Sequence, residues 1–429
     1  MQKSEEQKKL LSRLFASALR AVSASQCLPA HLPQLGDEGR VWVIGAGKGA
    51  AAMAQVVEQH YGDRIAGGIV VTRYQHGARC ERIKVIEAAH PVPDDAGEQA
   101  ARQVMESLQG LTEQDTVLCL MTGGASSLLA LPAEGLTLQD KQHINRALLK
   151  SGADIHEMNC VRKHLSAIKG GRLAQACLPA SLQTYVISDV PGDEPGTVGS
   201  GPSVENFSTP EDAISILKRY GIQISPAVAA HLQSERAKTP IFSEQQRHKN
   251  SVHVVATARD ALEAAKQEAL QAGYAVWLMS DAIEGEARDI AKMHGALALE
   301  IQKGCGPVKP PCILLSGGET TVTVKGKGRG GRNAEFLLSL AQTIKGSAGI
   351  CALACDTDGI DGVENNAGAI LTQAVIEKAQ AQGLNYLTFL DDNNAYEFFE
   401  RCDGLIVTGP TLTNVNDFRA IVIEPLPQT

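Results

Sequence analysis

Residues 41–60, VWVIGAGKGAAAMAQVVEQH, predict the fold class of this chain. The apolar run that begins at Val41 is typical of a buried strand, Gly45 and Gly47 of a tight turn, and the alanine-rich remainder of a helix. Residues 116–131, TVLCLMTGGASSLLAL, repeat this order of strand, glycine turn and helix. Such alternation predicts a parallel sheet that is covered by helices on both faces.

The alternation continues along the chain and restarts after a polar, helical segment that begins near residue 209. We therefore expect an α/β protein of two domains with mostly parallel sheets flanked by helices. The boundaries expected are 1–247 for a Rossmann-like N-terminal domain and 248–429 for a C-terminal α/β domain. Apolar residues from Leu10 to Val22 have helical spacing, which predicts a helix at the start of the chain.

Composition restricts the class of protein. Of 429 residues, 44% are hydrophobic and 21% are charged, as in ordinary globular proteins. A net charge of −8 argues against a general nucleic-acid binder. We expect no membrane span, because no run of about 18 apolar residues occurs, and Arg13 and Arg20 interrupt what would be the apolar core of a signal peptide. A cytoplasmic protein is expected, and the sequence leaves a homodimer open.

Glycine or acidic clusters directly follow five of the predicted strands. Ligands of open α/β sheets bind outside the carboxyl ends of the strands, so these clusters predict an enzyme rather than a scaffold. The clusters are Gly45–Lys48, Gly123–Ser127, Asp189, Gly317–Glu319 and Asp356–Asp361.

The turn at Gly45 and Gly47 has the GxGxxA spacing of a dinucleotide-binding loop, although close packing of helix on strand needs the same glycines. An NAD site also needs an acidic residue at the end of the second strand, and that strand ends in Arg73. An arginine there would suit NADP. Lys48, at the start of the helix, could reach an anion held at the helix N-terminus or lie in solvent.

The second glycine turn favours anion binding or simple helix capping. Gly123 and Gly124 allow a ligand to approach the backbone, and Ser126 and Ser127 could bond a phosphate or a carboxylate. No GxSxG motif is present, so an acyl-transfer hydrolase is not supported. The basic stretch at 159–173, with Arg162, Lys169 and Arg172, could face the same anion or form a solvated face.

Four aspartates are candidate Mg²⁺ ligands. Asp189 and Asp193 lie in an acidic loop after a strand, where a carboxylate could hold Mg²⁺ or orient a hydroxyl nucleophile, or simply form an exposed turn. Asp356 and Asp361 follow a later strand in a segment that lacks the final glutamate of a calcium loop.

A glycine-rich basic segment at 316–335 suits a polyphosphate, although it has no Walker A spacing. Arg332 is placed where a helix begins. The other candidate nucleotide-binding residues there are Gly317, Gly318, Glu319, Gly330, Gly331 and Asn333.

The chain resembles the class II glycerate kinases, which have a glycerate-kinase N-terminal domain and a C-terminal MOFRL domain. The matching segments run in the family's order from about residue 40 to 420. They are GAGKGAAAMA, HPVPD, MTGGASSLL, NCVRKHLSAIKGGRLA, VISDVPGD, GTVGSGP, LLSGGETTVTVKGKGRGGRNAEF, DTDGIDG and TGPTLTNVND.

The resemblance implies ATP- and Mg²⁺-dependent phosphorylation of the C2 hydroxyl of D-glycerate, with the active site in the cleft between the two domains. The motif lysine falls on Lys48 and the motif arginine on Arg332, while Gly49 and Ala334 depart from the family pattern. As catalytic residues, Lys48 and Arg332 would neutralise the charge that develops on the phosphoryl oxygens and bind the substrate carboxylate. Asp189 or Asp193 would orient the hydroxyl or hold the metal. Two rivals stay open: an NAD(P)H-dependent hydroxypyruvate reductase, which is an older label of this family, and a non-catalytic sensor of nucleotides or sugar acids.

Overall fold

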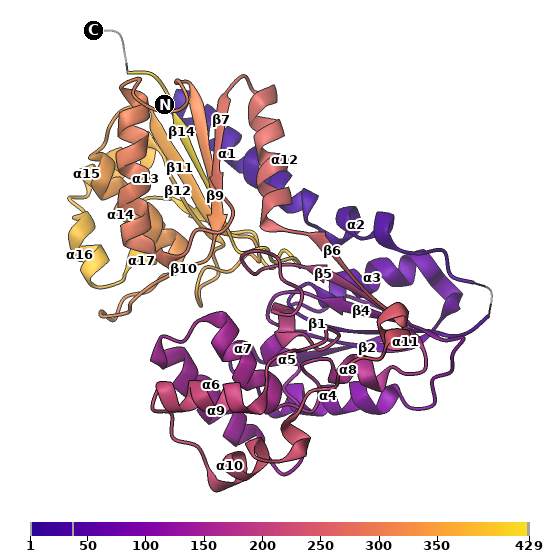
Figure 1. Cartoon of the computed structure of the whole chain (residues 1–429). Helices are drawn as coiled ribbons and strands as arrows, with labels where there is room; N and C mark the ends of the chain where they lie inside the picture. The colour runs from indigo at the N-terminus through magenta and orange to yellow at the C-terminus, as the bar shows by residue number, and fades with distance from the viewer. Residues whose placement is uncertain (1, 37, 427–429) are drawn as a thin grey trace. The chain divides into compact units, whose positions relative to one another are not determined.

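The computed structural model describes residues 2–36 and 38–426, which form two compact units. Residues 24–255 make the N-terminal unit, and residues 1–23 with 256–429 make the C-terminal unit (Figure 1). Each unit is built around one six-stranded sheet. Over the described residues, no helix has the length and apolar character needed to cross a bilayer.

The N-terminal sheet has the strand order β3-β2-β1-β4-β5-β6. The pairs β1–β2, β1–β4, β2–β3 and β4–β5 are parallel, which confirms the expected Rossmann-like domain. The two strands at its centre are almost wholly buried, as a sheet covered on both faces requires. The strands are β1 (Val41–Ala46), β2 (Ile65–Arg73), β3 (Ile83–Ala88), β4 (Thr116–Met121), β5 (Ser181–Ile187) and β6 (Asn250–Ala256).

Helices of the N-terminal unit follow the strands as the sequence predicts, and two of the longer ones, α6 and α7, begin with capping boxes from Thr137 and Asp154. They are α2 (Ala24–Cys27), α3 (Ala50–Tyr61), α4 (Asp95–Ser107), α5 (Ala125–Leu128), α6 (Leu138–Ser151), α7 (Ile155–His164), α8 (Arg172–Ala176), α9 (Pro210–Arg219), α10 (Pro226–Leu232) and α11 (Glu244–Lys249).

The C-terminal sheet is mixed, so the expectation of a mostly parallel sheet is wrong for this unit. Its order is β13-β12-β11-β14-β9-β7, and its neighbouring strands are antiparallel except for β7 and β9, which are parallel. The last strand, β14, enters between β11 and β9 in the opposite direction. Its first residue, Asp417, therefore lies beside the last residues of its neighbours, Asp356 and Gly318.

The strands of this unit are β7 (Ala275–Ser280), β8 (Gly285–Glu286), β9 (Cys312–Gly318), β10 (Thr320–Thr321), β11 (Ile350–Asp356), β12 (Gly368–Leu371), β13 (Leu405–Ile406) and β14 (Asp417–Ile423). The helices are α1 (Gln2–Ala21), α12 (Ala258–Gln271), α13 (Ala287–Gln302), α14 (Arg332–Ile344), α15 (Gln373–Ala381), α16 (Tyr386–Asp391) and α17 (Ala395–Arg401).

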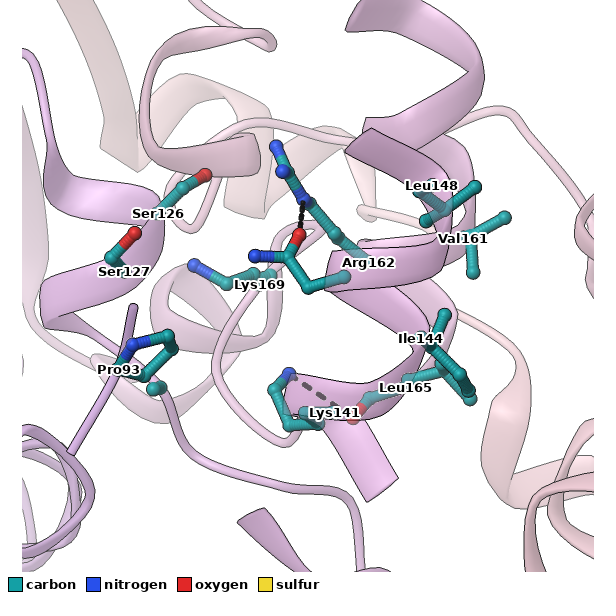
Figure 2. A pocket seen from close by; sticks show the side chains of 12 residues that line it. Pro93, Ser126, Ser127, Lys141, Ile144, Leu148, Val161, Arg162, Leu165 and Lys169 are labelled. Atoms are coloured by element: carbon teal, nitrogen blue, oxygen red, sulfur yellow. Dashed lines mark hydrogen bonds between the residues drawn. The ribbon is translucent and has the colours of Figure 1, made fainter. Parts of the chain in front are cut away.

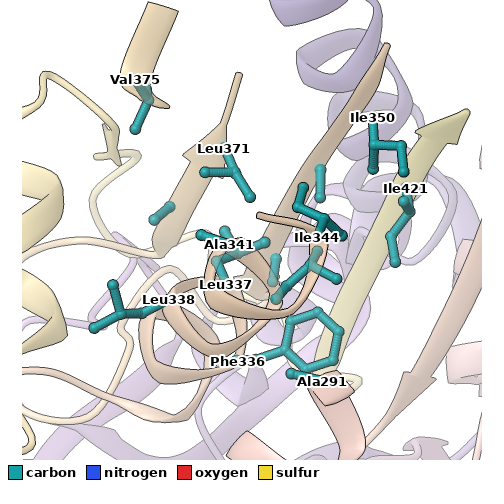
Figure 3. Close-up of a cluster of buried hydrophobic side chains, with 14 of the residues drawn as sticks. Ala291, Phe336, Leu337, Leu338, Ala341, Ile344, Ile350, Leu371, Val375 and Ile421 are labelled. Carbon is teal, nitrogen blue, oxygen red and sulfur yellow. The ribbon is translucent and has the colours of Figure 1, made fainter. Parts of the chain in front are cut away.

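Helix α14 lies at the centre of the C-terminal core. Phe336, Leu337 and Ile344 pack against strands β11, β12 and β14, which contribute Ile350 and Ile421 (Figure 3). Most of α14 is buried, as expected for a helix covered on all sides by other elements. Its first residue is Arg332, so the core fixes the position of this arginine.

The units divide differently from the boundary expected at 247–248. Strand β6 belongs to the N-terminal sheet, and the N-terminal helix α1 belongs to the C-terminal unit. Phe15 of α1 packs on Phe418 of β14, with ring centroids 5.5 Å apart, and Leu11 and Leu14 are fully buried. The apolar stripe of α1 was visible in the sequence, but its partner is about 400 residues away and could not be inferred from it.

Candidate functional site

The loops after β1 and β4 lie side by side at the point where the strand order of the N-terminal sheet reverses. The amide of Lys48 donates to the Gly123 carbonyl at 2.8 Å, and that of Gly49 to Thr122 Oγ1 at 2.9 Å. The amide of Gly47 donates to a β2 carbonyl at 3.0 Å. These amides already have protein partners, so the turn lacks the row of N–H groups that a dinucleotide pyrophosphate requires.

The glycines of these loops have two uses. A Cβ at Gly45 would lie 2.3 Å from a β4 carbonyl, and one at Gly47 would lie 2.1 Å from a side chain of the β4 loop, so both allow close packing. Gly124, with a φ of +87°, instead faces the side chains above the sheet. A Cβ there would lie 3.0 Å from His90 and 3.4 Å from Lys48, so Gly124 leaves room for both.

The two predicted serines of α5 both have partners. Ser126 Oγ lies 2.6 Å from Ser200 Oγ, which in turn donates to Asn159 Oδ1 at 2.9 Å. Ser127 Oγ donates to the Pro91 carbonyl at 2.7 Å. These bonds connect the β4 loop to α7 and to the segment after β5, and they hold Ser126 at the edge of a cavity.

That cavity has a volume of ≈ 40 Å³ and lies between α5, α6 and α7 (Figure 2). Three cations line it: Lys141 from α6, Arg162 from α7 and Lys169 from the segment before α8, facing Ser126 and Ser127. The other lining residues, apolar apart from Asn145, are Pro93, Ala130, Ile144, Leu148, Val161 and Leu165.

The three cations are held by neutral acceptors. Lys169 Nζ donates to a carbonyl in the segment after β5 at 3.1 Å, and Lys141 Nζ to a carbonyl just after α7 at 3.3 Å. Arg162 Nε donates to Asn145 Oδ1 at 2.7 Å. Within residues 2–36 and 38–426, none of the three forms an ion pair with a carboxylate.

Loss of hydration without a counter-charge perturbs all three groups, of which Lys169 is buried and Lys141 and Arg162 are half-buried. Burial, followed by repulsion from Arg162 and Arg172, lowers the pKa of Lys141 to about 7, and the charge of Glu98 opposes this shift. Burial, with repulsion from Lys141 and Arg162, lowers the pKa of Lys169 well below its usual value. Burial also lowers the pKa of Arg162 to about 10. An anion in the cavity would relieve each of these penalties.

Arg172 of the same basic stretch does not line this cavity. Its guanidinium donates to five backbone carbonyls, those of Lys163, Lys169, Arg236, Ala237 and Lys238. It therefore connects α8 to the loop after α10 and has a structural role, whereas Arg162 and Lys169 line the cavity.

In the C-terminal unit, both oxygens of the buried Asp417 carboxylate accept hydrogen bonds. Oδ1 accepts from Arg332 Nε at 2.7 Å and from Asn333 Nδ2 at 2.8 Å. Oδ2 accepts from Arg419 and from the Thr320 amide, the latter at 3.1 Å. Burial alone would raise the pKa of Asp417, but Arg332 and Arg419 hold this pKa below its usual value.

Arg332, a predicted catalytic residue, is surrounded by acids. Nε bonds to Asp417, Nη2 to Asp356 at 2.7 Å, and Nη1 to Glu319 at 3.1 Å. Asp356 and Asp417 are buried, whereas the Glu319 side chain is 48% exposed. Only the Nη1 group of the guanidinium could bond to a ligand, and the Glu319 carboxylate would first have to move away from it.

Two predicted metal ligands have protein partners instead. Asp361 accepts from the amides of Asn333 and Ala334 at 3.0 and 2.9 Å, so it caps the start of α14. Burial raises the pKa of Asp361 to about 6, which these two bonds oppose. Asp356 bonds to Arg332 as described. Over the described residues, no group of three or more His, Cys, Asp or Glu is arranged to hold a metal.

The predicted glycines of this unit also pack closely. A Cβ at Gly331 would lie 2.3 Å from the Asp361 carboxylate, and one at Gly318 would lie 2.2 Å from the backbone of Ile283. The Gly317 carbonyl accepts from Arg419 at 3.2 Å, and Gly330 lies in the loop that leads to α14. These glycines allow the charged cluster to form. A nucleotide contact by them stays a prediction.

Asp189 and Asp193 lie in the loop that follows β5, at the carboxyl edge of the N-terminal sheet, and both are half-buried. Asp193 has a φ of 53°, a left-handed conformation that the flanking Gly192 helps the turn to reach. The loop therefore brings two carboxylates to the edge of the sheet where the Lys48 and Ser126 loops lie.

Three residues of these clusters were not predicted from the sequence. Lys141 belongs to an amphipathic helix and has no motif around it, and Asp417 and Arg419 alternate with apolar residues in a strand. A buried strand with an acid and an arginine two residues apart, on the same face, was a signal for an internal ion pair.

Comparisons with known proteins agree with this architecture. Residues 10–233 match the family described as a domain of unknown function, DUF4147, and residues 312–417 match the MOFRL family. A D-glycerate 2-kinase from Thermotoga maritima is 37% identical over 96% of this chain and 97% of its own. A relative from Agrobacterium vitis, 46% identical over 97% of this chain and 94% of its own, carries a provisional hydroxypyruvate reductase name.

Solved structures give the same result. The crystal structure of a glycerate kinase from Thermotoga maritima superimposes with a TM-score of 0.87 at 36% identity, covering 98% of this chain and 100% of that one.

Lys169→Met should stabilise the protein. The substitution removes a buried amine with no counter-charge, so we expect the free energy of unfolding to rise by about 2 kcal/mol at neutral pH. The gain should shrink as the pH rises toward 10.5, where the lysine of the unfolded chain also becomes neutral. Urea unfolding at neutral and alkaline pH measures both effects. Lys150→Met, at an exposed position of α6, is the control, and an equal effect there would contradict the prediction.

Asp417→Asn should strongly destabilise the C-terminal unit. It leaves Arg332 and Arg419 close together without their shared charge, which should cost about 3–5 kcal/mol. Glu319→Gln removes the exposed partner of Arg332 and should cost less than about 1 kcal/mol. Chemical denaturation of both variants checks the contrast, and equal losses would show that Asp417 is not the central carboxylate.

Proposed function

Because the chain belongs to the class II glycerate kinase family, we propose that it transfers the γ-phosphate of ATP to the C2 hydroxyl of D-glycerate, giving 2-phosphoglycerate and ADP. The observation that carries the proposal is the cavity of Lys141, Arg162 and Lys169, which offers positive charge without a carboxylate partner. Both substrates of this reaction are anions, and the cavity lies at the ligand-binding edge of a Rossmann-like sheet.

Lys48 is the residue that we assign to the transferring phosphoryl group. It begins the segment that leads into α3, is half-buried, and lies beside Gly124 and His90, where the β1 and β4 loops meet. A cation fixed at this position would neutralise charge that develops on the phosphoryl oxygens in the transition state. The loop that holds it is already bonded, so little reorganisation is needed during the reaction.

Mg²⁺ commonly accompanies ATP through one or two carboxylates and the phosphates themselves. Asp189 and Asp193 fit that requirement, because they are two half-buried carboxylates in one loop at the sheet edge. When bound there, Mg²⁺ would neutralise the phosphate oxygens. Asp189 would also orient the substrate hydroxyl. Asp356 and Asp361 fit less well, since Arg332 and the start of α14 already use their oxygens.

In this proposal, Arg332 can contact a ligand only if Glu319 moves away from it. Its Nε and Nη2 groups are committed to buried acids, and its Nη1 group faces the exposed Glu319. We assign to Nη1 a contact with a nucleotide phosphate that replaces Glu319. Gly317, Gly318, Gly330, Gly331 and Asn333 would then act mainly by holding this arginine.

The reductase alternative has less support. The amides of the Gly47–Gly49 turn have protein partners, and β2 ends in Arg73 rather than in an acid. A nicotinamide cofactor would therefore lack both its pyrophosphate cradle and its ribose carboxylate. Loss of NADH or NADPH absorbance on addition of hydroxypyruvate would reverse this preference.

Purified protein with D-glycerate, ATP and Mg²⁺ should produce a signal when enolase is added without a mutase, because enolase consumes only 2-phosphoglycerate. Lys48→Ala should lower turnover by about 10²-fold or more while the protein stays folded, since a preorganised charge is lost. Lys218→Ala, at an exposed site on α9, is the matched control. ADP release without an enolase signal would move the phosphate to another acceptor, and normal turnover of Lys48→Ala would exclude the role of Lys48.

A further inference from the structure

The cationic cavity is small and has two kinds of wall. A buried water needs about 10–15 Å³ of such volume, so ≈ 40 Å³ has room for about three water-sized groups. The ammonium and guanidinium groups face the hydroxyls of Ser126 and Ser127, and Leu148 and Val161 lie farther from those hydroxyls (Figure 2). This volume suits one end group of a small ligand better than a whole nucleotide.

The shape of the donors decides between the small anionic groups. A phosphoryl group has three terminal oxygens that point in different directions and need donors on several sides. A carboxylate has two oxygens in one plane, and its carbon end tolerates an apolar wall. About half of the residues that line the cavity are apolar, so its lining fits a carboxylate better.

Resting on the proposed function, we infer that this cavity binds the carboxylate of the small hydroxy acid that accepts the phosphoryl group. Arg162 is the residue that determines this specificity. Its Nε bond to Asn145 and a longer bond from Nη1 to Asn159 Oδ1 hold the guanidinium in place. Nη2 has no acceptor within the part of the chain that the structure describes, and it can donate to the carboxylate. Lys141 and Lys169 have no competing acids, and a bound carboxylate would favour their charged forms.

The assignment separates two anion sites in the mechanism. The acid substrate is held by its carboxylate in the cavity, whereas the phosphates are bound by Lys48 and the loop carboxylates through Mg²⁺. Loss of Arg162 should therefore weaken binding of the acid and leave binding of ATP unchanged. A purely structural arginine would not produce this difference.

The test is calorimetric titration of D-glycerate into the full-length protein without nucleotide. Arg162→Gln should weaken binding by about 10-fold or more, the loss expected for a charged hydrogen bond. Arg146→Gln, at an exposed site on α6, should bind like the wild type. Glycerol, which lacks the carboxylate, should not bind to either protein. In steady-state kinetics, Arg162→Gln should raise KM for glycerate and leave KM for ATP unchanged.

A second variant guards against misfolding of the first. Lys141→Met removes one long bond to a backbone carbonyl and should fold, and Lys150→Met on the same helix is its control. The affinity of the wild type for glycerate should fall from about pH 6 to about pH 9, because Lys141 loses its proton near pH 7 beside Arg162, Lys169, Arg172 and Glu98. Lys141→Met should flatten that dependence.

Several outcomes overturn the assignment. Unchanged glycerate binding in Arg162→Gln would make the residue structural, and a raised KM for ATP would give the cavity to a nucleotide phosphate. Inorganic phosphate could also compete with glycerate and lose its binding in Arg162→Gln. That result would show that the cavity binds a phosphoryl group rather than a carboxylate. If the wild type binds glycerate through Arg162 but forms no 2-phosphoglycerate, the cavity assignment holds and the proposed reaction fails. If the wild type binds no glycerate, the assignment fails.

Discussion

Burying a charged side chain costs free energy, and both units of this protein contain such side chains. The two units differ in how that cost is offset. In the C-terminal unit, Asp417 is shared between Arg332 and Arg419, and Asp356 and Glu319 complete the neutralisation. Mutual attraction and hydrogen bonds offset the loss of hydration there. In the N-terminal unit, Lys141, Arg162 and Lys169 face a cavity with only neutral acceptors. Buried positive charge without a partner destabilises a fold, so its presence indicates a missing anion.

This difference explains why similar motifs have different uses. The glycines before α3 and α14 look like two phosphate loops in the sequence, yet both bring protein groups close together. Gly47 lets the β1 loop approach β4, and Gly331 lets the start of α14 approach Asp361. Their amides and neighbouring side chains are largely bonded within the protein. The anion sites that we propose are therefore made by side chains, Lys48 and the cavity cations, which those bonded loops and helices carry.

The sequence was sufficient to predict most of the N-terminal unit and only part of the C-terminal one. Three parallel strands of the N-terminal sheet, β1, β3 and β4, are directly followed by a helix, so local periodicity near Val41 and Thr116 gave the correct architecture. In the C-terminal unit, β14 inserts antiparallel between two earlier strands, and α1 packs on it from the other end of the chain. Pairings between such distant segments leave no local pattern. The same limit applies to Lys141, whose significance depends on Arg162 and Lys169 reaching the same cavity.

Arg332 and Arg162 both lie in basic stretches of the sequence, and the packing around each arginine decides what it can bind. Arg332 is the first residue of a helix that the core fixes on all sides, and buried acids occupy two of its three nitrogens. Arg162 sits on a helix with one apolar face, and it is held by asparagines that carry no charge. An asparagine orients a guanidinium without neutralising it, so Arg162 keeps its full attraction for an anion, whereas the acids around Arg332 reduce that attraction. For this reason we expect the stronger anion site in the cavity and a weaker one at the Nη1 group of Arg332.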